Sequence, residues 1–147
     1  MNRDFVEMLS ALRDAGAEYL VVGAHALAAH GVPRATGDLD LWIRPTADNA
    51  ARVWSALGAF GAPLTDVKVA DLATVDMVFQ FGVAPARIDI LTGVSGLSFD
   101  EAWPGRLDVR IEGVEVPVIG REALIRNKRA AGRPRDLADV SELEERR

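Results

Sequence analysis

The chain contains no cysteine, and that absence excludes three kinds of chemistry. Disulfide bonds, thiolate zinc sites and cysteine nucleophiles all need a thiol, so the sequence gives no support to an oxidising compartment. Histidine is also scarce. We expect its two copies, His25 and His30, to pack or to cap rather than to bind a metal.

Long apolar runs are missing as well. No stretch approaches the roughly 20 residues that a membrane-spanning helix needs, and the N-terminal residues 1–4 are not followed by a signal-peptide pattern. We therefore expect a soluble cytoplasmic protein with no membrane partner. The 147 residues amount to one domain, long enough to remove roughly two-thirds of its unfolded surface from water. We predict a single domain over residues 1–147, with a core over about 17–120 and a helical element over about 121–147.

Basic residues are fewer than acidic residues, and they are unevenly distributed along the chain. The net charge of −5 argues against a general nucleic-acid coat. Residues 121–135 nevertheless hold six basic residues and one acid, whereas residues 136–145 hold five acids and no base. A local basic patch can therefore coexist with an acidic protein, although a solvated helix face explains most of these arginines more simply.

Apolar periodicity divides the chain into helices and strands. Helical spacing predicts helices over residues 4–15, 24–30, about 47–58, 121–131 and from Pro134 onwards, with a shorter one near 67–72. Alternation predicts strands over residues 19–22, 38–43, 76–81 and 86–91, and a hairpin of residues 107–111 and 114–118 around Glu112-Gly113. Trp54 falls on the apolar face of its helix, which favours a core position over a base-stacking platform.

Asp38-Leu39-Asp40 is the most informative pattern among these elements. Side chains two apart on a strand share a face, so both carboxylates point one way while Leu39, Leu41 and Ile43 point the other. Two such acids alone are also typical of a solvated strand end. Asp89 adds weight because it lies among apolar residues, where a carboxylate is costly to bury unless it is paired or bound to a metal. Three acids on neighbouring strands predict a magnesium or manganese site.

A second pattern lies upstream of these acids. The strand-like run of residues 19–22 ends in Gly23, and a helix-like segment begins at Ala24. A strand, a glycine and a helix N-terminus together form a phosphate-binding arrangement, because backbone N–H groups point toward the anion.

Taken in order, these residues resemble a known family. Gly23-Ala24, then Asp38-Leu39-Asp40 between apolar residues, then Asp89 on a later strand, resemble the nucleotidyltransferase superfamily of the DNA polymerase β type. Residues 20–43, which include Arg34-x-Thr36-x-Asp38-x-Asp40, are most similar to the small prokaryotic branch that contains the nucleotidyltransferase toxins of AbiE-type toxin–antitoxin systems.

The resemblance implies a fold and a set of roles. The fold would be α+β, with a short mixed β-sheet, helices on one face and a C-terminal helical pair that closes a cleft. Asp38 and Asp40 would hold two magnesium ions, and Asp89 would complete the second site and help activate the attacking hydroxyl. The backbone of Gly23 and Ala24 would face the triphosphate, with Arg34 or Thr36 as helpers.

One position departs from the family pattern. Ala24 stands where the family usually has glycine or serine, so the backbone donor is kept but no hydroxyl is available for a phosphate oxygen. This departure affects nucleotide affinity more than metal binding.

The end of the chain supplies a further candidate, Lys128. It shares a helix face with Leu124 and Ile125, so either its stem packs while its amine reaches water, or the amine contacts a triphosphate. Lys128 followed by Arg135-Asp136-x-x-Asp139 resembles the late elements of the toxin branch. By that resemblance Lys128 would meet the β- or γ-phosphate, and Asp136 or Asp139 would orient it or the acceptor. The helix dipole explains an acid in a first turn equally well.

The implied activity is transfer of a nucleoside monophosphate from an NTP to an acceptor hydroxyl, with Mg²⁺ or Mn²⁺ as cofactor. The acceptor could be tRNA, a protein or a small molecule such as an aminoglycoside or a lincosamide, and a toxin would have an antitoxin partner. Two alternatives stay open. Ala24 favours a catalytically weak nucleotide-binding or complex-forming module, and the basic residues of 121–135 favour a nonenzymatic RNA- or antitoxin-binding protein.

Overall fold

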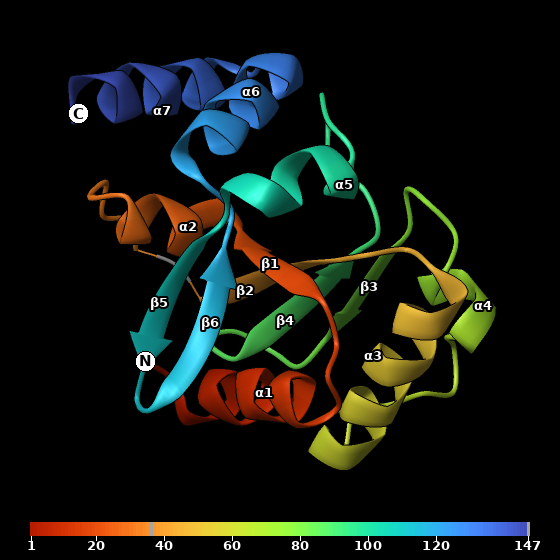
Figure 1. Ribbon diagram of the computed structural model, residues 1–147. Helices are drawn as coiled ribbons and strands as arrows, with labels where there is room; N and C mark the ends of the chain where they lie inside the picture. The colour runs from red at the N-terminus through yellow and green to blue at the C-terminus, as the bar shows by residue number, and fades with distance from the viewer. Residues whose placement is uncertain (36, 147) are drawn as a thin grey trace.

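Six strands form one mixed sheet in the order β3-β4-β2-β1-β6-β5 (Figure 1). The computed structural model describes residues 1–35 and 37–146. The central strands β1 and β2 are antiparallel, β2 runs parallel to β4, and β1 runs parallel to β6. The strands are β1 (Tyr19–Val22), β2 (Asp38–Ile43), β3 (Val78–Phe81), β4 (Arg87–Leu91), β5 (Leu107–Ile111) and β6 (Val114–Val118).

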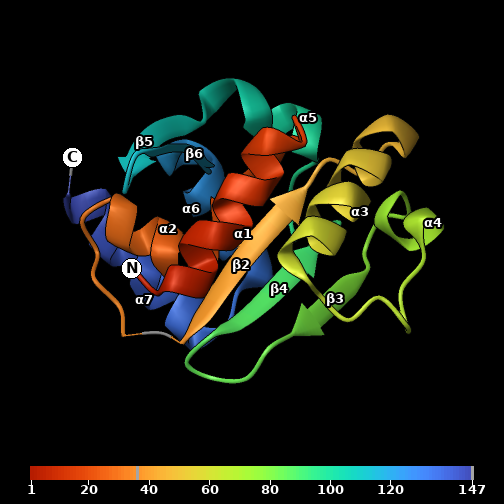
Figure 2. The ribbon, with the colours of Figure 1, turned by 90° about the horizontal axis from the view of Figure 1, so that it is seen from below.

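One face of the sheet is covered by α1 (Arg3–Asp14) and α3 (Ala47–Phe60), which lie side by side in Figure 2. The β2 side chains expected in the core, Leu39, Leu41 and Ile43, have no exposed surface. They alternate with Asp38 and Asp40, which are only partly buried. The predicted alternation of β2 is therefore confirmed, and the aspartates lie on the face opposite α1 and α3.

Helix α3 differs from expectation at its end. The Thr46 hydroxyl caps its N-terminus by accepting a hydrogen bond from the Asn49 backbone N–H at 3.3 Å. The helix then continues through Gly58 to Phe60 and is capped by Gly61, slightly beyond the predicted end near Gly58. Gly61 has a φ of 92°, the left-handed conformation that ends helices, whereas Gly58 lies inside the helix.

The aspartate face is partly covered by elements of its own. Helix α2 (Gly23–Ala29) directly follows β1. The short helix α5 (Phe99–Ala102) and a 3₁₀ turn (Trp103–Gly105) pack at the far end of β2, where the rings of Phe99 and Trp42 meet edge to face at 5.3 Å. The sequence patterns did not predict α5, whereas the expected short helix near residue 70 is present as α4 (Val69–Leu72).

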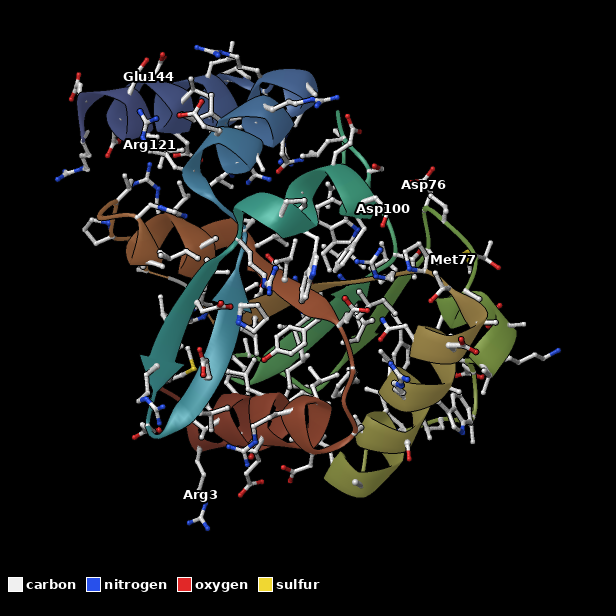
Figure 3. All side chains as sticks on the ribbon, in the orientation of Figure 1. Arg3, Asp76, Met77, Asp100, Arg121 and Glu144 are labelled. Atoms are coloured by element: carbon white, nitrogen blue, oxygen red, sulfur yellow. The ribbon has the colours of Figure 1, made fainter. Side chains whose placement is uncertain are left out.

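The predicted hairpin and the predicted C-terminal helical pair are both confirmed. Glu112 and Gly113 join β5 to β6 with φ values of 47° and 83°, as a two-residue hairpin turn requires. Helices α6 (Arg121–Ala131) and α7 (Pro134–Glu145) lie against one another beyond α2 and α5 (Figure 1). The Arg121 guanidinium ties them together by donating to the Leu143 carbonyl at 3.0 Å (Figure 3).

Candidate active site

The parallel pairing of β2 with β4 brings the three predicted aspartates together. In this register Asp38 lies opposite Arg87, and Asp40 lies opposite Asp89. All four side chains therefore share one face of the sheet. The carboxyl groups of Asp40 and Asp89 are joined by a hydrogen bond, and Asp89 is only 6% exposed. The acids predicted on separate strands are therefore neighbours on one face of the sheet.

Arg87 lies in the middle of the cluster, although the sequence patterns did not single it out. Its Nη2 donates to Asp38 Oδ2 at 2.7 Å, and its Nε and Nη2 donate to the two oxygens of Asp89 at 3.1 and 3.2 Å. The signal that could have found it is the spacing of Arg87 and Asp89, because two residues apart on a strand share a face. We name Asp38, Asp40, Arg87 and Asp89 the sheet cluster.

Crowding of acids changes the protonation of Asp40. Burial, followed by the hydrogen bond and negative charge of Asp89 and by a smaller contribution from Asp38, raises the pKa of its carboxyl to about 7. The charge of Arg87 opposes this rise. Asp40 therefore holds its proton to a higher pH than an exposed aspartate does, and its titration is coupled to that of the neighbouring carboxylate.

Gly23 lies directly against this cluster. Its φ is 69°, a conformation that residues with a Cβ rarely adopt, and a Cβ at this position would collide with Oδ2 of Asp40. Glycine is therefore required for two independent reasons, the turn itself and the close approach of Asp40. The predicted phosphate turn and the predicted acid pair are parts of one structure.

A cavity of about 410 Å³ opens beside Gly23 between the sheet and the helical pair. It brings together the predicted residues Gly23, Ala24, Arg34, Asp38, Asp40, Lys128 and Asp139. Asp89 and Asp136 do not line it and reach it through their partners Asp40 and Lys128. Thr36, a predicted helper at the triphosphate, lies outside the described residues. Arg133 and Arg135, which were not among the predicted site residues, also line the cavity.

Lys128 is held in this cavity by two buried acids. Its Nζ lies 3.2 Å from Asp139 Oδ2 and 3.5 Å from Asp136 Oδ1, and its side chain is 13% exposed. Arg133 Nε donates to Asp136 at 2.6 Å and lowers the pKa of that carboxyl. The Asp136 side chain has no exposed surface, so its place in the first turn of α7 reflects these ion pairs as well as the helix dipole.

Arg34 completes the group from the opposite side of the cavity. It pairs with Asp139 and, at 3.3 Å, with Glu142. We name Arg34, Lys128, Arg133, Asp136, Asp139 and Glu142 the helical cluster. Three cations meet three acids in it, so the group neutralises itself.

The remaining basic residues of α6 are paired on the surface. Arg126 lies 3.0 Å from Glu101, and Arg129 lies 3.1 Å from Glu144. This pairing agrees with the interpretation of residues 121–135 as a solvated helix face rather than a nucleic-acid surface.

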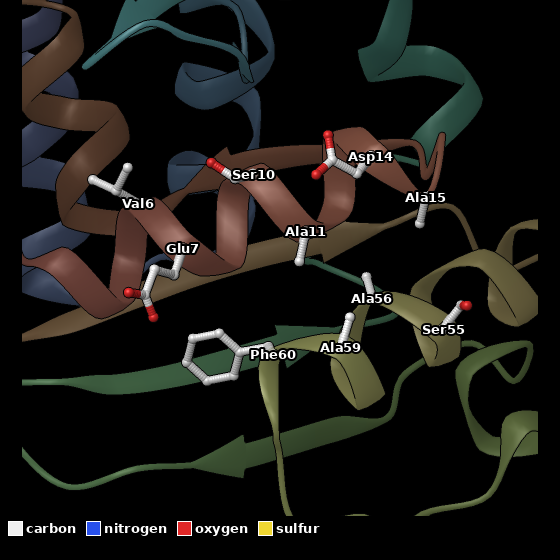
Figure 4. Close-up of a pocket in the computed structure, with 10 residues that line it drawn as sticks. All are labelled: Val6, Glu7, Ser10, Ala11, Asp14, Ala15, Ser55, Ala56, Ala59 and Phe60. Atoms are coloured by element: carbon white, nitrogen blue, oxygen red, sulfur yellow. The ribbon is translucent and has the colours of Figure 1, made fainter.

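A larger cavity, of about 570 Å³, lies between α1 and α3 (Figure 4). Small side chains such as Ser10, Ala11 and Ala56 line it, with Glu7 and Asp14 at α1. These helices cover the sheet face opposite the aspartates. This cavity therefore has no part in the arrangement of Gly23, Asp40 and Lys128.

Comparison with known proteins now fixes the family. The family described as "Nucleotidyl transferase of unknown function (DUF2204)" matches residues 1–146. The chain belongs to this family. It is thus an enzyme of the nucleotidyl transferase class, which agrees with the predicted activity in its general form.

The fold of this nucleotidyl transferase is found among solved structures. A crystal structure of a protein from Thermotoga maritima, named a "putative nucleotidyltransferase", superposes with a TM-score of 0.64 at 15% sequence identity. The match covers 99% of this chain and 92% of that one, which confirms the α+β fold predicted from the sequence. A comparison with curated proteins gives no significant match.

Neither a membrane span nor a ready-made metal site is found in residues 1–35 and 37–146. No helix there combines the length and apolar character needed to cross a bilayer. No three acidic or histidine side chains there are arranged to hold a metal ion as they stand. His30 instead contacts the Ile119 carbonyl through Nε2 at 2.7 Å, and His25 packs edge to face on Phe5. In the sheet cluster, the guanidinium of Arg87 is the cation between Asp38 and Asp89.

Proposed function

We propose that this nucleotidyl transferase moves a nucleoside monophosphate from an NTP to an acceptor hydroxyl in a metal-dependent reaction. The observation that carries the proposal is the meeting of Asp38, Asp40 and Asp89 on one sheet face, directly against Gly23. The cavity beside them is lined by cationic side chains, as a site for a triphosphate requires.

The donor chemistry of the sheet cluster fits a hard divalent cation. Asp38, Asp40 and Asp89 offer only oxygen ligands, which suit Mg²⁺ or Mn²⁺. Asp89 is buried, and burial together with the neighbouring carboxylates raises the pKa of Asp40, so additional positive charge would stabilise the ionised group. To hold a metal, Asp38 would turn its bonded oxygen away from Arg87. When bound, a pair of such ions stabilises both the attacking and the leaving oxygen of an in-line displacement.

The chain's own residues then have defined tasks. Gly23 and Ala24 present backbone N–H groups to the triphosphate, and Lys128 neutralises its β- or γ-phosphate, aided by Arg34. Asp89 accepts the proton of the acceptor hydroxyl. The oxygen of that hydroxyl bonds to the α-phosphorus of the NTP. The bond between the α-phosphorus and the oxygen that bridges it to the β-phosphorus breaks. The products are the nucleotidylated acceptor and pyrophosphate.

We further propose that the enzyme belongs to the toxin-like branch and has an antitoxin partner. The support is the sequence pattern Arg34-x-Thr36-x-Asp38-x-Asp40 together with the late Lys128 and Arg135-Asp136-x-x-Asp139. The ion pairs of Asp136 and Asp139 with Lys128 support the orienting role that this pattern implies for them. The acceptor would then be tRNA, a protein or a small molecule.

A second candidate is a nucleotide-binding module with little turnover. It is favoured by Ala24, which lacks a phosphate-binding hydroxyl, and by the guanidinium of Arg87 between the acids. Calorimetry separates the two candidates. Magnesium-dependent binding of an NTP without pyrophosphate release would favour the module.

The decisive experiment incubates the purified chain with each α-³²P-labelled NTP, MgCl₂ and a cell extract as the source of acceptors. We expect label to enter one class of acceptor, and we expect Asp38→Asn and Asp40→Asn to abolish the transfer. Asp48→Asn is the matched control, because Asp48 is an exposed acid on α3, on the other face of the sheet. Absence of transfer with all four nucleotides, or transfer that survives both cluster variants, would refute the proposal.

A further inference from the structure

Arg87 makes contacts that none of the proposed catalytic roles uses. It opens β4, and its guanidinium bonds both oxygens of Asp89 on its own strand and one oxygen of Asp38 on the neighbouring strand. The side chain is 39% exposed, and the side-chain hydrogen bonds of its guanidinium go to carboxylates. These contacts therefore serve the acids around it.

The geometry of these bonds differs between the two acids. Asp89 receives two donors from the planar fork, an arrangement that fixes both the position and the orientation of a carboxylate. From the same guanidinium Asp38 receives one donor, at 2.7 Å, across the β2–β4 pair. This one hydrogen bond from Arg87 is easier to exchange than the bidentate contact within β4.

The position of the guanidinium also sets the local electrostatics. Asp38 and Asp89 would hold a divalent cation close to this guanidinium, which contacts Asp38 Oδ2 and both oxygens of Asp89. Two positive charges a few ångströms apart repel each other by several-fold more in a partly buried site than in water. Arg87 therefore opposes the entry of a metal that brings no negative charge of its own.

Resting on the proposed function, we propose that Arg87 is a positioning residue with two effects. It occupies the cation position between Asp38 and Asp89 until a metal–nucleotide complex arrives, and it then releases Asp38 while keeping Asp89 aimed at the acceptor. The triphosphate supplies the negative charge that makes exchange of cations favourable. As a result, the affinity of the site for a metal ion alone is low, and its affinity for a metal ion bound to a nucleotide is higher.

The test measures metal binding apart from turnover. We titrate Mn²⁺ into the chain and follow free Mn²⁺ by electron paramagnetic resonance, with and without a non-hydrolysable NTP analogue. In Arg87→Gln we expect the Kd of Mn²⁺ alone to fall about tenfold, because one repelling charge is gone. We expect kcat to fall about 10- to 100-fold, because Asp89 loses its orienting partner.

Two further variants separate positioning from general structure. Arg87→Lys keeps the charge but not the fork, so the Kd of Mn²⁺ should stay close to that of the original chain while kcat stays low. Arg52→Gln, at an exposed position on α3, should change neither quantity. The melting temperature in EDTA should fall for Arg87→Gln and recover when MnCl₂ is added, because the metal replaces the missing cation.

The outcomes distinguish this inference from the proposed function. If the original chain binds Mn²⁺ and transfers label, but Arg87→Gln binds Mn²⁺ no more tightly, the role of Arg87 is refuted and the proposed function stands. If the original chain neither binds Mn²⁺ nor transfers label, the proposed function fails. In that case we compare the melting temperatures of Arg87→Gln and the original chain in EDTA. If they are equal, the proposal that Arg87 occupies the cation position between Asp38 and Asp89 is refuted as well.

Discussion

The two charged clusters beside the cavity differ in their balance of charge. The sheet cluster contains three aspartates and one cation, Arg87. The helical cluster contains three acids and three cations, which form ion pairs with one another. The first group holds more acids than cations, and burial together with the neighbouring carboxylates raises the pKa of Asp40. The second is neutral, and the pKa of Asp136 is lowered. We infer that a ligand binds at the sheet cluster, where acids outnumber cations. The helical cluster, where acids and cations are equal in number, is structural and positions Lys128.

The strongest test of this contrast is Asp40→Asn. Losing one shared carboxylate ligand should remove several kcal/mol of transition-state stabilisation, which is about a 10³-fold loss in the rate of transfer. The same change removes a crowded charge, so the melting temperature without metal at pH 8 should rise rather than fall. Label transfer and thermal unfolding measure the two effects. A variant that is both inactive and less stable would contradict the idea that the sheet cluster lacks cations.

The opposite result is expected for Asp136→Ala in the helical cluster. This carboxylate is fully buried between Lys128 and Arg133, and removing one partner of a buried pair costs about 3–5 kcal/mol. Chemical denaturation measures that loss. Asp48→Ala is the matched control, because it is also a first-turn acid but is exposed, and helix-dipole effects there amount to about 0.3–1 kcal/mol. Equal losses in the two variants would mean that the dipole alone explains Asp136.

The two clusters should also respond to pH in opposite directions. Asp40 has a folded pKa of about 7, above the unfolded value of about 4. The folded state therefore holds the proton more tightly, and the stability that this provides at low pH is lost as pH rises from about 4 to 7. The lowered pKa of Asp136 acts the other way, because its contribution is present at neutral pH and is lost as pH falls through the folded value.

Thermal unfolding in EDTA across this pH range measures the effect. The decline toward pH 7 should disappear in Asp40→Asn and should be weaker with MgCl₂. A decline that persists unchanged in Asp40→Asn would assign it to another group.

The smallest effect is expected for Ala24→Ser, which restores a hydroxyl at the cavity lining. A hydrogen bond to a charged phosphate contributes about 1.5 kcal/mol, so KM for the NTP should fall up to about tenfold while kcat changes little. Steady-state kinetics separate the two constants. If both stay unchanged, position 24 does not contact the nucleotide.

Much of this arrangement could be predicted from local patterns. The alternation of Asp38 and Asp40 with buried leucines, and the apolar neighbours of Asp89, are period-two signals that one strand carries by itself. The structure agrees with the positions they indicated. The hairpin at Glu112-Gly113 was equally clear, because its turn needs positive φ values that this dipeptide accepts.

Other features depend on contacts between distant segments, which no local pattern reports. The order of the six strands sets Arg87 opposite Asp38, and only that pairing shows that an arginine lies among the acids. The pairing of Asp136 and Asp139 with Lys128 depends on how α7 packs on α6. Helix α5 was overlooked because it has a single turn, although its capping box from Ser98 to Glu101 was a usable signal.

The wide spacing of the cavity's residues along the chain has a consequence for biosynthesis. Gly23 and Asp40 are made early, Asp89 comes some fifty residues later, and Lys128 and Asp139 follow only in the last quarter of the sequence. A ribosome-bound fragment ending before β4 carries two of the acids without their neighbours. On the proposed function, a growing chain therefore has no competent centre until Lys128 and Asp139 have been made and have packed beside Gly23.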